Sequence, residues 1–177
     1  MSANDLAVGF GYITVRELNC IQQIVKLLPP DPICVNIGSG AGTSVVAVLE
    51  ARPDAKVVDV DIDPLNGVTQ IREAGYLYSG RYTRIVSDSK IVRWPHKCQY
   101  LFIDGDHSEP GIRGDLVTWL PCVAKGGYIL LHDYWAYPPD HELAGRIDWP
   151  NVREVADEVL AAYAVVMDVD RIRVYQA

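Results

Sequence analysis

An apolar run that breaks into alternating glycines constrains this chain more than any other feature. Residues 33–37 are mostly apolar, Gly38, Gly40 and Gly42 follow at alternate positions, and an apolar stretch begins after Ser44. The pattern predicts a strand, a tight turn and a helix. Because glycine has no Cβ, the backbone of such a turn can approach a ligand closely, and the following helix presents free amides to it. We therefore expect a nucleotide or nucleoside at this turn.

The spacing of the glycines narrows the ligand class. The dinucleotide fingerprint G-x-G-x-x-G needs a third glycine where Thr43 stands here. The spacing therefore weakens the case for NAD. A purely structural turn between strand and helix is the alternative interpretation.

Composition bounds the class of protein. A chain of 177 residues has the size of one domain, and we expect residues 1–177 to form a single domain. No apolar run approaches the roughly 20 residues of a membrane span, and residues 1–5 do not resemble a secretory signal, so we expect a cytoplasmic protein without membrane contact. The four cysteines form no C-x-x-C pair and are predicted to be reduced core residues: Cys20, Cys34, Cys98 and Cys122.

The net charge of −7 argues against general binding to nucleic acid, because its phosphates would be repelled. One stretch is basic, with Asp88 as its only acid. It contains Arg81, Arg84, Lys90, Arg93 and Lys97. A solvated charged face is the expected interpretation, and docking of an anionic substrate or partner is the alternative.

Strand and helix patterns alternate along the chain. Residues 1–30 are predicted to be helical, with a capping box from Thr14 to Glu17. Apolar runs predict strands at 33–37, 56–61, 82–86, 100–103 and 128–131, and periodic stretches predict helices from Thr43, from Pro64 to Gly75, at 111–123 (closed by Gly126 and Gly127) and at 151–162. Residues 163–167 and 171–175 flank a turn too short for a crossover, so they must pair antiparallel. The expected fold is α/β, a three-layer sandwich around a mostly parallel seven-stranded sheet with a C-terminal antiparallel hairpin.

Polar residues follow each predicted parallel strand. They lie at 36–42, 61–63, 87–89, 104–107 and 132–133. Because ligands of open α/β sheets bind outside the carboxyl ends of the strands, we expect these residues to share one rim and to form a ligand site there.

Several of these segments together resemble one enzyme family. They are the glycine turn, the acidic end of the second strand, Phe102–Ser108 (FIDGDHS), Asp115 with Trp119, and Lys125–Tyr134 (KGGYILLHDY). The combination is similar to class I S-adenosylmethionine-dependent methyltransferases, in a small subgroup with IDGDH and GG…HD strand ends that is related to O-methyltransferases. The resemblance covers residues 12–176. It implies a Rossmann-like fold and methyl transfer to a small-molecule acceptor, with a hydroxyl as the expected target.

The resemblance implies a set of cofactor-binding residues for S-adenosylmethionine: Asn36, Gly38, Ser39, Gly40, Asp61, Ile62, Asp88, Ser89 and Asp104. Asp61 would accept hydrogen bonds from both ribose hydroxyls, Ile62 would cover the adenine, and Asp88 or Ser89 would bind its amino edge. Asn36 departs from the family pattern, which has a carboxylate there. Asp59 is expected on the opposite face of its strand from Asp61, in a structural role.

The resemblance also implies catalytic residues. His107 is the first candidate for general base and Asp106 the second, with Asp104 beside them. Asp104 and Asp133 match positions at which related O-methyltransferases hold Mg²⁺. The alternatives are that these carboxylates orient cofactor or substrate, and that His107 merely caps the following helix.

The proline-rich and aromatic loop 134–150 is expected to form the acceptor wall, through Trp135, Tyr137 and Trp149. Two other function classes stay open: a non-catalytic module that binds the cofactor and serves a partner protein, and a nucleotide-dependent oxidoreductase. The expected partners are a small-molecule acceptor and a second copy of the chain in a homo-oligomer.

Overall fold

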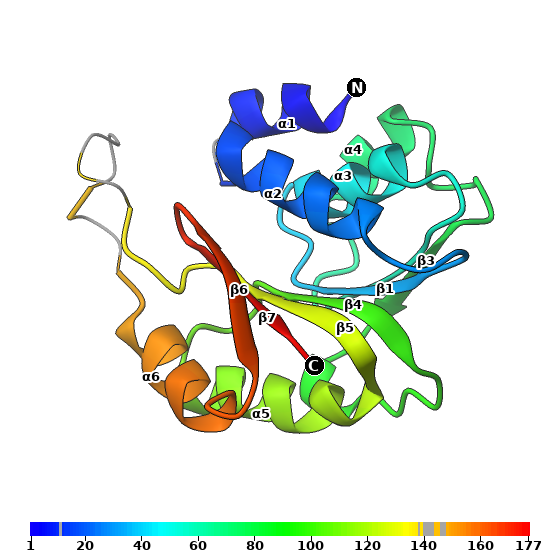
Figure 1. The fold of residues 1–177 in the computed structure, drawn as a ribbon. Coiled ribbons are helices and arrows are strands. Elements are labelled where there is room, and N and C mark those ends of the chain that lie inside the picture. Colours follow the sequence, from blue (N-terminus) through cyan, green and yellow to red (C-terminus); the bar gives the residue numbers. More distant parts are fainter. Residues whose placement is uncertain (11, 138, 140–143, 146–147) are drawn as a thin grey trace.

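A single seven-stranded sheet forms the middle layer of the computed structural model, which describes residues 1–10, 12–137, 139, 144–145 and 148–177 (Figure 1). The strands are β1 (Ile33–Ile37), β2 (Lys56–Asp61), β3 (Tyr82–Val86), β4 (Cys98–Ile103), β5 (Val123–Leu131), β6 (Ala164–Val169) and β7 (Ile172–Gln176). Their order in the sheet is β3-β2-β1-β4-β5-β7-β6. Strands β1 to β5 are parallel, and β7 is antiparallel to both β5 and β6. The predicted sheet and its C-terminal hairpin are confirmed.

Helices cover both faces of the sheet. They are α1 (Ala3–Phe10), α2 (Val15–Lys26), α3 (Thr43–Ala51), α4 (Val68–Glu73), α5 (Glu109–Trp119) and α6 (Pro150–Val159), with short 3-10 turns η1 (Ser89–Ile91) and η2 (Leu120–Cys122). Figure 1 shows α1 to α4 on one face and α5 with α6 on the other. The predicted capping box of α2 is present, since Glu17 N–H donates to Thr14 Oγ1 at 3.1 Å and Thr14 N–H donates to Glu17 Oε2 at 2.7 Å.

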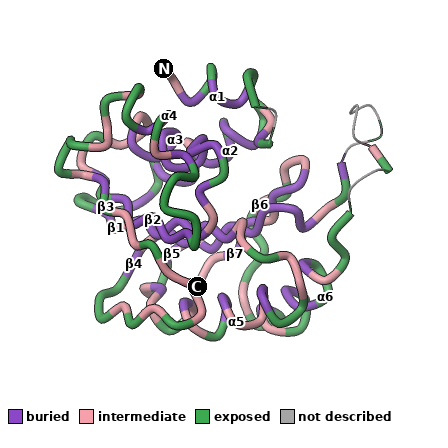
Figure 2. Tube along the Cα trace, turned by 180° about the vertical axis from the view of Figure 1, so that it is seen from behind, coloured by how far each residue is buried: buried purple, intermediate pink, exposed green. Residues whose placement is uncertain are grey.

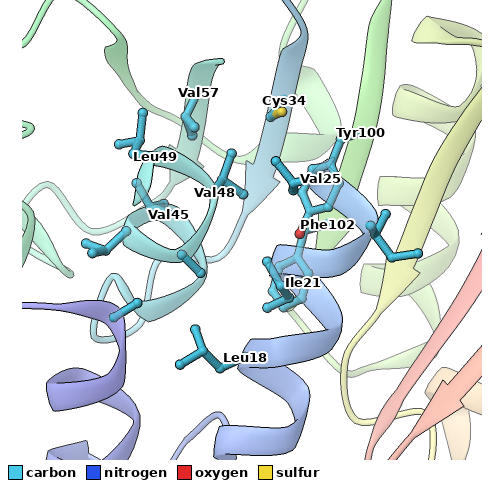
Figure 3. Close-up of a cluster of buried hydrophobic side chains, with 14 of the residues drawn as sticks. Leu18, Ile21, Val25, Cys34, Val45, Val48, Leu49, Val57, Tyr100 and Phe102 are labelled. Atoms are coloured by element: carbon cyan, nitrogen blue, oxygen red, sulfur yellow. The ribbon is translucent and has the colours of Figure 1, made fainter. Parts of the chain in front are cut away.

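Each face of the sheet has its own apolar core. On one side, Ile21 and Val25 of α2, Val45 of α3 and Phe102 of β4 belong to one cluster of buried apolar side chains (Figure 3). On the other side, Trp119 of α5 is fully buried, as predicted. Full burial of such side chains contributes about 1.5–3 kcal/mol each. The central strands β1, β2 and β4 are therefore buried from both sides, while the edge strands β3 and β6 and the outer helix faces stay more exposed (Figure 2). The carboxyl ends of the central strands are the part of the sheet left free to form a site.

The helix predicted from Pro64 begins later than expected, at Val68. Leu65 N–H donates to Asp63 Oδ1 at 2.8 Å, which closes a local turn. Gly67 has a φ of 69°, in the left-handed region that a helix does not contain. Residues 62–67 therefore form an extended turn on the rim of the sheet.

The helix predicted at 111–123 ends at Trp119, because Pro121 lies in the tighter turn η2 and cannot continue an α-helical hydrogen-bond ladder. The prediction that Gly126 and Gly127 close this helix is wrong, because both lie inside β5. A Cβ on Gly127 would come within 2.9 Å of the carbonyl oxygen of Ala124. This glycine therefore serves close packing of the strand.

Within the described part of the chain, no helix combines the length and the apolar character needed to cross a bilayer. All four cysteines are free thiols. Cys20, Cys34 and Cys98 are buried and Cys122 is half-buried. Burial raises the pKa of the Cys20 thiol to about 11, so it is an unreactive core residue, as predicted.

Candidate functional site

The carboxyl ends of β1, β2 and β4 open onto a cavity of about 440 Å³, called here the first cavity. Its lining contains every predicted cofactor residue except Asn36 and Ser39: Gly38, Gly40, Asp61, Ile62, Asp88, Ser89 and Asp104. The predicted base candidate Asp106 also lines it. Residues from four separate stretches of sequence thus meet on one rim.

Gly38 is required at its position by both conformation and packing. Its φ is 83°, a value that residues with side chains rarely adopt, and its N–H donates to the carbonyl of Val60 at 2.9 Å. A Cβ at this position would lie 1.9 Å from the carbonyl oxygen of Asp104. The glycine turn therefore packs directly against the end of β4.

Asp61 joins the two turns that border the first cavity. Its Oδ2 accepts the N–H of Ser39 and its Oδ1 accepts the N–H of Asp63, each at 2.8 Å. The amide nitrogen of Asn66 lies 3.5 Å from both oxygens. A carboxylate has about four acceptor positions, so acceptor capacity remains for a ligand with two neighbouring hydroxyls. Asn66 was not predicted from the sequence as a site residue. Its position in the polar turn directly after Asp61 could have indicated it.

The side chains of Asn36 and Ser39 point to Asp59 instead of the first cavity. Asn36 Nδ2 donates to Asp59 Oδ1 at 2.9 Å and to the carbonyl of Gly38 at 3.0 Å, and Ser39 Oγ donates to Asp59 Oδ2. Asp59 is fully buried and has the structural role we expected. The expectation that it faces away from Asp61 is wrong, because residues two apart in a strand point to the same face.

The basic residues of 81–97 do not form one solvated face. The guanidinium of Arg84 is ion-paired with buried Asp59. Arg81 donates to backbone carbonyls at the end of α3, and Lys90 Nζ lies 3.1 Å from Asp88 Oδ1. Lys97 Nζ donates to the carbonyl of Pro121 at 2.7 Å. These four residues of the predicted cluster therefore have four different sets of partners.

A second cavity, of about 300 Å³, lies beside the first. It is lined by Tyr12, Gly40, Asp104, His107, His132, Asp133, Tyr137, Trp149 and Arg171. Gly40 and Asp104 line both cavities. The two cavities therefore meet at the ends of β1 and β4.

The predicted acceptor loop contributes two of its three aromatic residues to the second cavity, namely Tyr137 and Trp149. Trp135 is not in the lining: its indole N–H donates to Asp168 at 3.1 Å, and Arg173 lies over its ring at 5.0 Å. For Trp135 the prediction is wrong, because a local cation–π and hydrogen-bond cluster holds the side chain away. Residues 138, 140–143 and 146–147 of this loop lie outside the described residues.

His107 lies between two carboxylates. Its Nε2 is 3.0 Å from Asp133 Oδ2 and 3.4 Å from Asp104 Oδ1, and its ring stacks on Trp149 with centroids 4.8 Å apart. Burial alone would lower the pKa of His107, but the two carboxylates outweigh burial and raise it to about 9. The alternative role as a helix cap is wrong, since Ser108 caps α5.

Asp104 and Asp133, the two carboxylates beside His107, also belong to a buried charge network. His132 Nδ1 is 3.1 Å from Asp104 Oδ1, and its Nε2 is 3.5 Å from Glu17 Oε2. Arg171 donates its backbone N–H to Glu17 Oε1 at 2.8 Å and its guanidinium to Asp133. Asp133 itself has a φ of 55°, a strained value for a non-glycine residue. The sequence did not predict that Glu17 and Arg171 belong to the site. Its only signal was Glu17 at the capping-box position, which indicates a helix cap and not a charge network.

The donor set of Asp104, His107 and Asp133 fits a divalent cation. One ligand atom from each lies within 4.8 Å of the others. The two carboxylates suit Mg²⁺ or Mn²⁺, while the imidazole is a better ligand for transition metals than for Mg²⁺. Nε2 of His107 is also buried, and both carboxylates lie within 3.4 Å of it. A cation here would compete with the proton on His107.

Comparisons with known proteins agree with this geometry. A family model described as a methyltransferase domain matches residues 35–134. No curated protein matches the sequence.

Solved structures share the fold. A protein from Corynebacterium glutamicum has a TM-score of 0.73 and 17% identity, over 98% of this chain and 87% of its own. The O-methyltransferase TomG from Streptomyces achromogenes, involved in tomaymycin synthesis and solved in complex with S-adenosylmethionine, has a TM-score of 0.69 and 17% identity, over 99% of this chain and 87% of its own. The pyocyanin biosynthetic protein PhzM has a TM-score of 0.64 and 21% identity over 88% of this chain. The chain spans about half the length of PhzM, 53%.

Proposed function

The chain belongs to the methyltransferase-domain family, and we propose that it transfers the methyl group of S-adenosylmethionine to a hydroxyl of a small-molecule acceptor. One observation carries this proposal: Gly40 and Asp104 line both cavities. A methyl donor in the first cavity and an acceptor in the second would meet at this junction. Alignment of donor and acceptor is the largest requirement of such a displacement.

The first cavity would hold the cofactor. Gly38 and Gly40 would allow its methionine and ribose part to approach the backbone, and Asp61 would accept the two ribose hydroxyls. Ile62, which is exposed on the rim, would cover the adenine. Asp88 or Ser89 would accept its amino group. Asn36 and Ser39 would stabilise the glycine turn indirectly, because their side chains hydrogen-bond to buried Asp59 and do not line the cavity.

The second cavity would hold the acceptor between Tyr137 and Trp149, with its hydroxyl toward Asp104 and His107. As the new O–C bond forms, the S–C bond breaks and the sulfonium loses its charge. The hydroxyl proton would pass to Nε2 of His107 when that ring is neutral, and Asp106 is the second candidate base. Since the pKa of His107 is about 9, the neutral ring increases in population as the pH rises toward that value.

Asp104 and Asp133 would hold a divalent cation such as Mg²⁺, which leaves Nε2 of His107 free to accept the proton. When bound, the cation would supply Lewis-acid activation of the acceptor oxygen. Arg171, paired with Asp133, fixes the orientation of that carboxylate.

A non-catalytic cofactor-binding module is the alternative, since Asp104 and His107 are already engaged with His132 and Asp133. The second cavity favours the enzyme, because a module that only binds the cofactor needs no space beside the methyl group. An oxidoreductase is disfavoured by the glycine spacing and by the terminal antiparallel hairpin.

Calorimetric titration with S-adenosylhomocysteine, with and without Mg²⁺, tests the proposal. Asp61→Ala should weaken binding by about 1–3 kcal/mol, because the ribose loses charged acceptors. Glu73→Ala is the control, since this exposed acid at the end of α4 is not in the cavity lining. No heat with the wild-type protein in either condition would defeat the proposal.

A further inference from the structure

Two turns border the first cavity, the glycine turn (38–42) and the turn that follows β2 (62–67). One side chain outside the cavity lining, Arg84 of β3, contacts both of them. Its Nη1 donates to Ser39 Oγ in the glycine turn and to Asp59. Its Nη2 donates to the carbonyl of Asp63 in the opposite turn and lies 4.0 Å from Asp61 Oδ2. One guanidinium therefore connects both walls of the cavity.

Arg84 and Asp59 form a buried pair. Their side chains are 12% and 0% exposed. Burial disfavours the charge on Arg84, but Asp59 outweighs this and raises the pKa of the guanidinium. Asp59 also accepts the hydroxyl of Tyr82 at 2.9 Å. A buried charge costs several kcal/mol without its partner, so the pair persists as a unit and gives Arg84 a fixed position.

Ser39 links Arg84 to Asp61, a residue of the cavity lining. Ser39 donates its backbone N–H to Asp61 and accepts Arg84 on its hydroxyl. Both contacts to Ser39 thus set the separation between the glycine turn and the carboxylate of Asp61. Arg84 itself is not in the cavity lining, so it acts on a ligand only through these two walls.

We propose that Arg84 is a positioning residue that sets the affinity of the first cavity for its nucleoside ligand without touching it. The inference rests on the proposed function for the identity of that ligand, S-adenosylmethionine or its demethylated product. A lysine cannot replace it, because an ammonium group lacks the planar fork that reaches Ser39, Asp59 and the carbonyl of Asp63 together.

The test compares Arg84→Lys with the double variant Asp59→Asn/Arg84→Met. The first keeps a positive charge beside Asp59, and the second removes the buried charges together, so the cost of one unpaired charge is avoided in both. Calorimetry gives the Kd for S-adenosylhomocysteine, and thermal unfolding gives the Tm of each protein.

We expect both variants to bind S-adenosylhomocysteine about 10-fold more weakly, because each loses one or two of the charged hydrogen bonds that hold the two turns in place. In turnover assays the KM for S-adenosylmethionine should rise while kcat at saturation stays near the wild-type value. Arg81→Lys is the control, since the Arg81 side chain donates to carbonyls at the end of α3, lies over the ring of Tyr76 and is outside the first cavity, and its Kd should not change.

The outcomes separate the two proposals. A lower Tm with an unchanged Kd in both Arg84 variants would reduce Arg84 to a purely structural residue and overturn the inference alone. Absence of binding to the wild-type protein would overturn the proposed function, and the inference with it.

Discussion

The backbone of Gly38 lies against the carbonyl oxygen of Asp104, with no room for a side chain between them: a Cβ at position 38 would sit 1.9 Å from that oxygen. Gly38 N–H is also bonded to the carbonyl of Val60. The end of β1 is thereby fixed between the ends of β2 and β4. This contact places the glycine turn and the acidic end of β4 on the same cavity, where the proposed methyl transfer would take place.

Gly38→Ala should abolish measurable binding of S-adenosylhomocysteine, because neither backbone can yield without moving a strand. Thermal unfolding and calorimetry measure the effect. Gly80→Ala is the matched control: its φ is 74°, but no atom lies within 4 Å of the added Cβ. It should cost about 1–2 kcal/mol of stability from backbone strain and leave the Kd unchanged. Wild-type affinity in Gly38→Ala would show that the turn is not rigidly packed.

The sequence was sufficient to predict the sheet and the rim. Short apolar runs ending in polar residues, such as 100–103 followed by Asp104, specify parallel strands whose carboxyl ends must meet. Helix boundaries were less predictable. Pro121, which ends α5, is a local signal that the prediction of a helix to residue 123 overlooked. The left-handed conformation of Gly67, which delays the start of α4, accompanies a close contact with Gly42 that the sequence pattern does not contain.

The charge network could not be predicted, for a different reason. Glu17 and Arg171 are separated by 154 positions, and Arg84 reaches Ser39 across 45. Only the folded sheet brings these residues together. Nothing in the local sequence distinguishes a buried, paired charge from a solvated one, which is why Arg84 was expected on a charged surface.

Trp149 and Trp135 belong to the same aromatic loop, yet only Trp149 lines the second cavity. For a hydroxyl compound that the wild-type protein methylates, Trp149→Ala should raise the acceptor KM about 10-fold, through loss of apolar area and of the platform for His107. Trp135→Ala should leave this KM unchanged, although it loses contacts with Arg173. Steady-state kinetics with saturating S-adenosylmethionine checks both. Equal effects of the two variants would contradict the assignment of the acceptor wall.

Asp115 predicts a pH dependence of folding stability. It is 1% exposed, and burial raises its pKa to about 6, above its ordinary value of 3.8. The folded state therefore binds more protons than the unfolded state between these values, so the free energy of unfolding should fall as the pH rises from about 4 to about 6. The loss should reach about 3 kcal/mol at neutral pH.

Asp115→Asn tests this origin of the pH dependence. The amide can still accept the hydroxyl of Ser89, which bonds Oδ1 of Asp115 in the wild-type protein, but it does not titrate. Urea unfolding at several pH values should show a flatter profile between pH 4 and 6 and a more stable protein at pH 7. An identical slope in the variant would assign the dependence to other groups.

His107 provides the last prediction, which needs no acceptor. Carboxylates on both sides raise its pKa from 6.5 to about 9; because the folded value is raised, the ion pairs stabilise the protein fully below pH 6.5 and are lost as the pH rises through 9. An NMR titration of the imidazole, assigned with His107→Gln, should show this pKa in chelator-treated protein. Mg²⁺ should lower it, since a cation held by Asp104 and Asp133 opposes the imidazolium charge. A raised pKa that Mg²⁺ leaves unchanged would show that the two carboxylates hold the proton of His107 in preference to a metal.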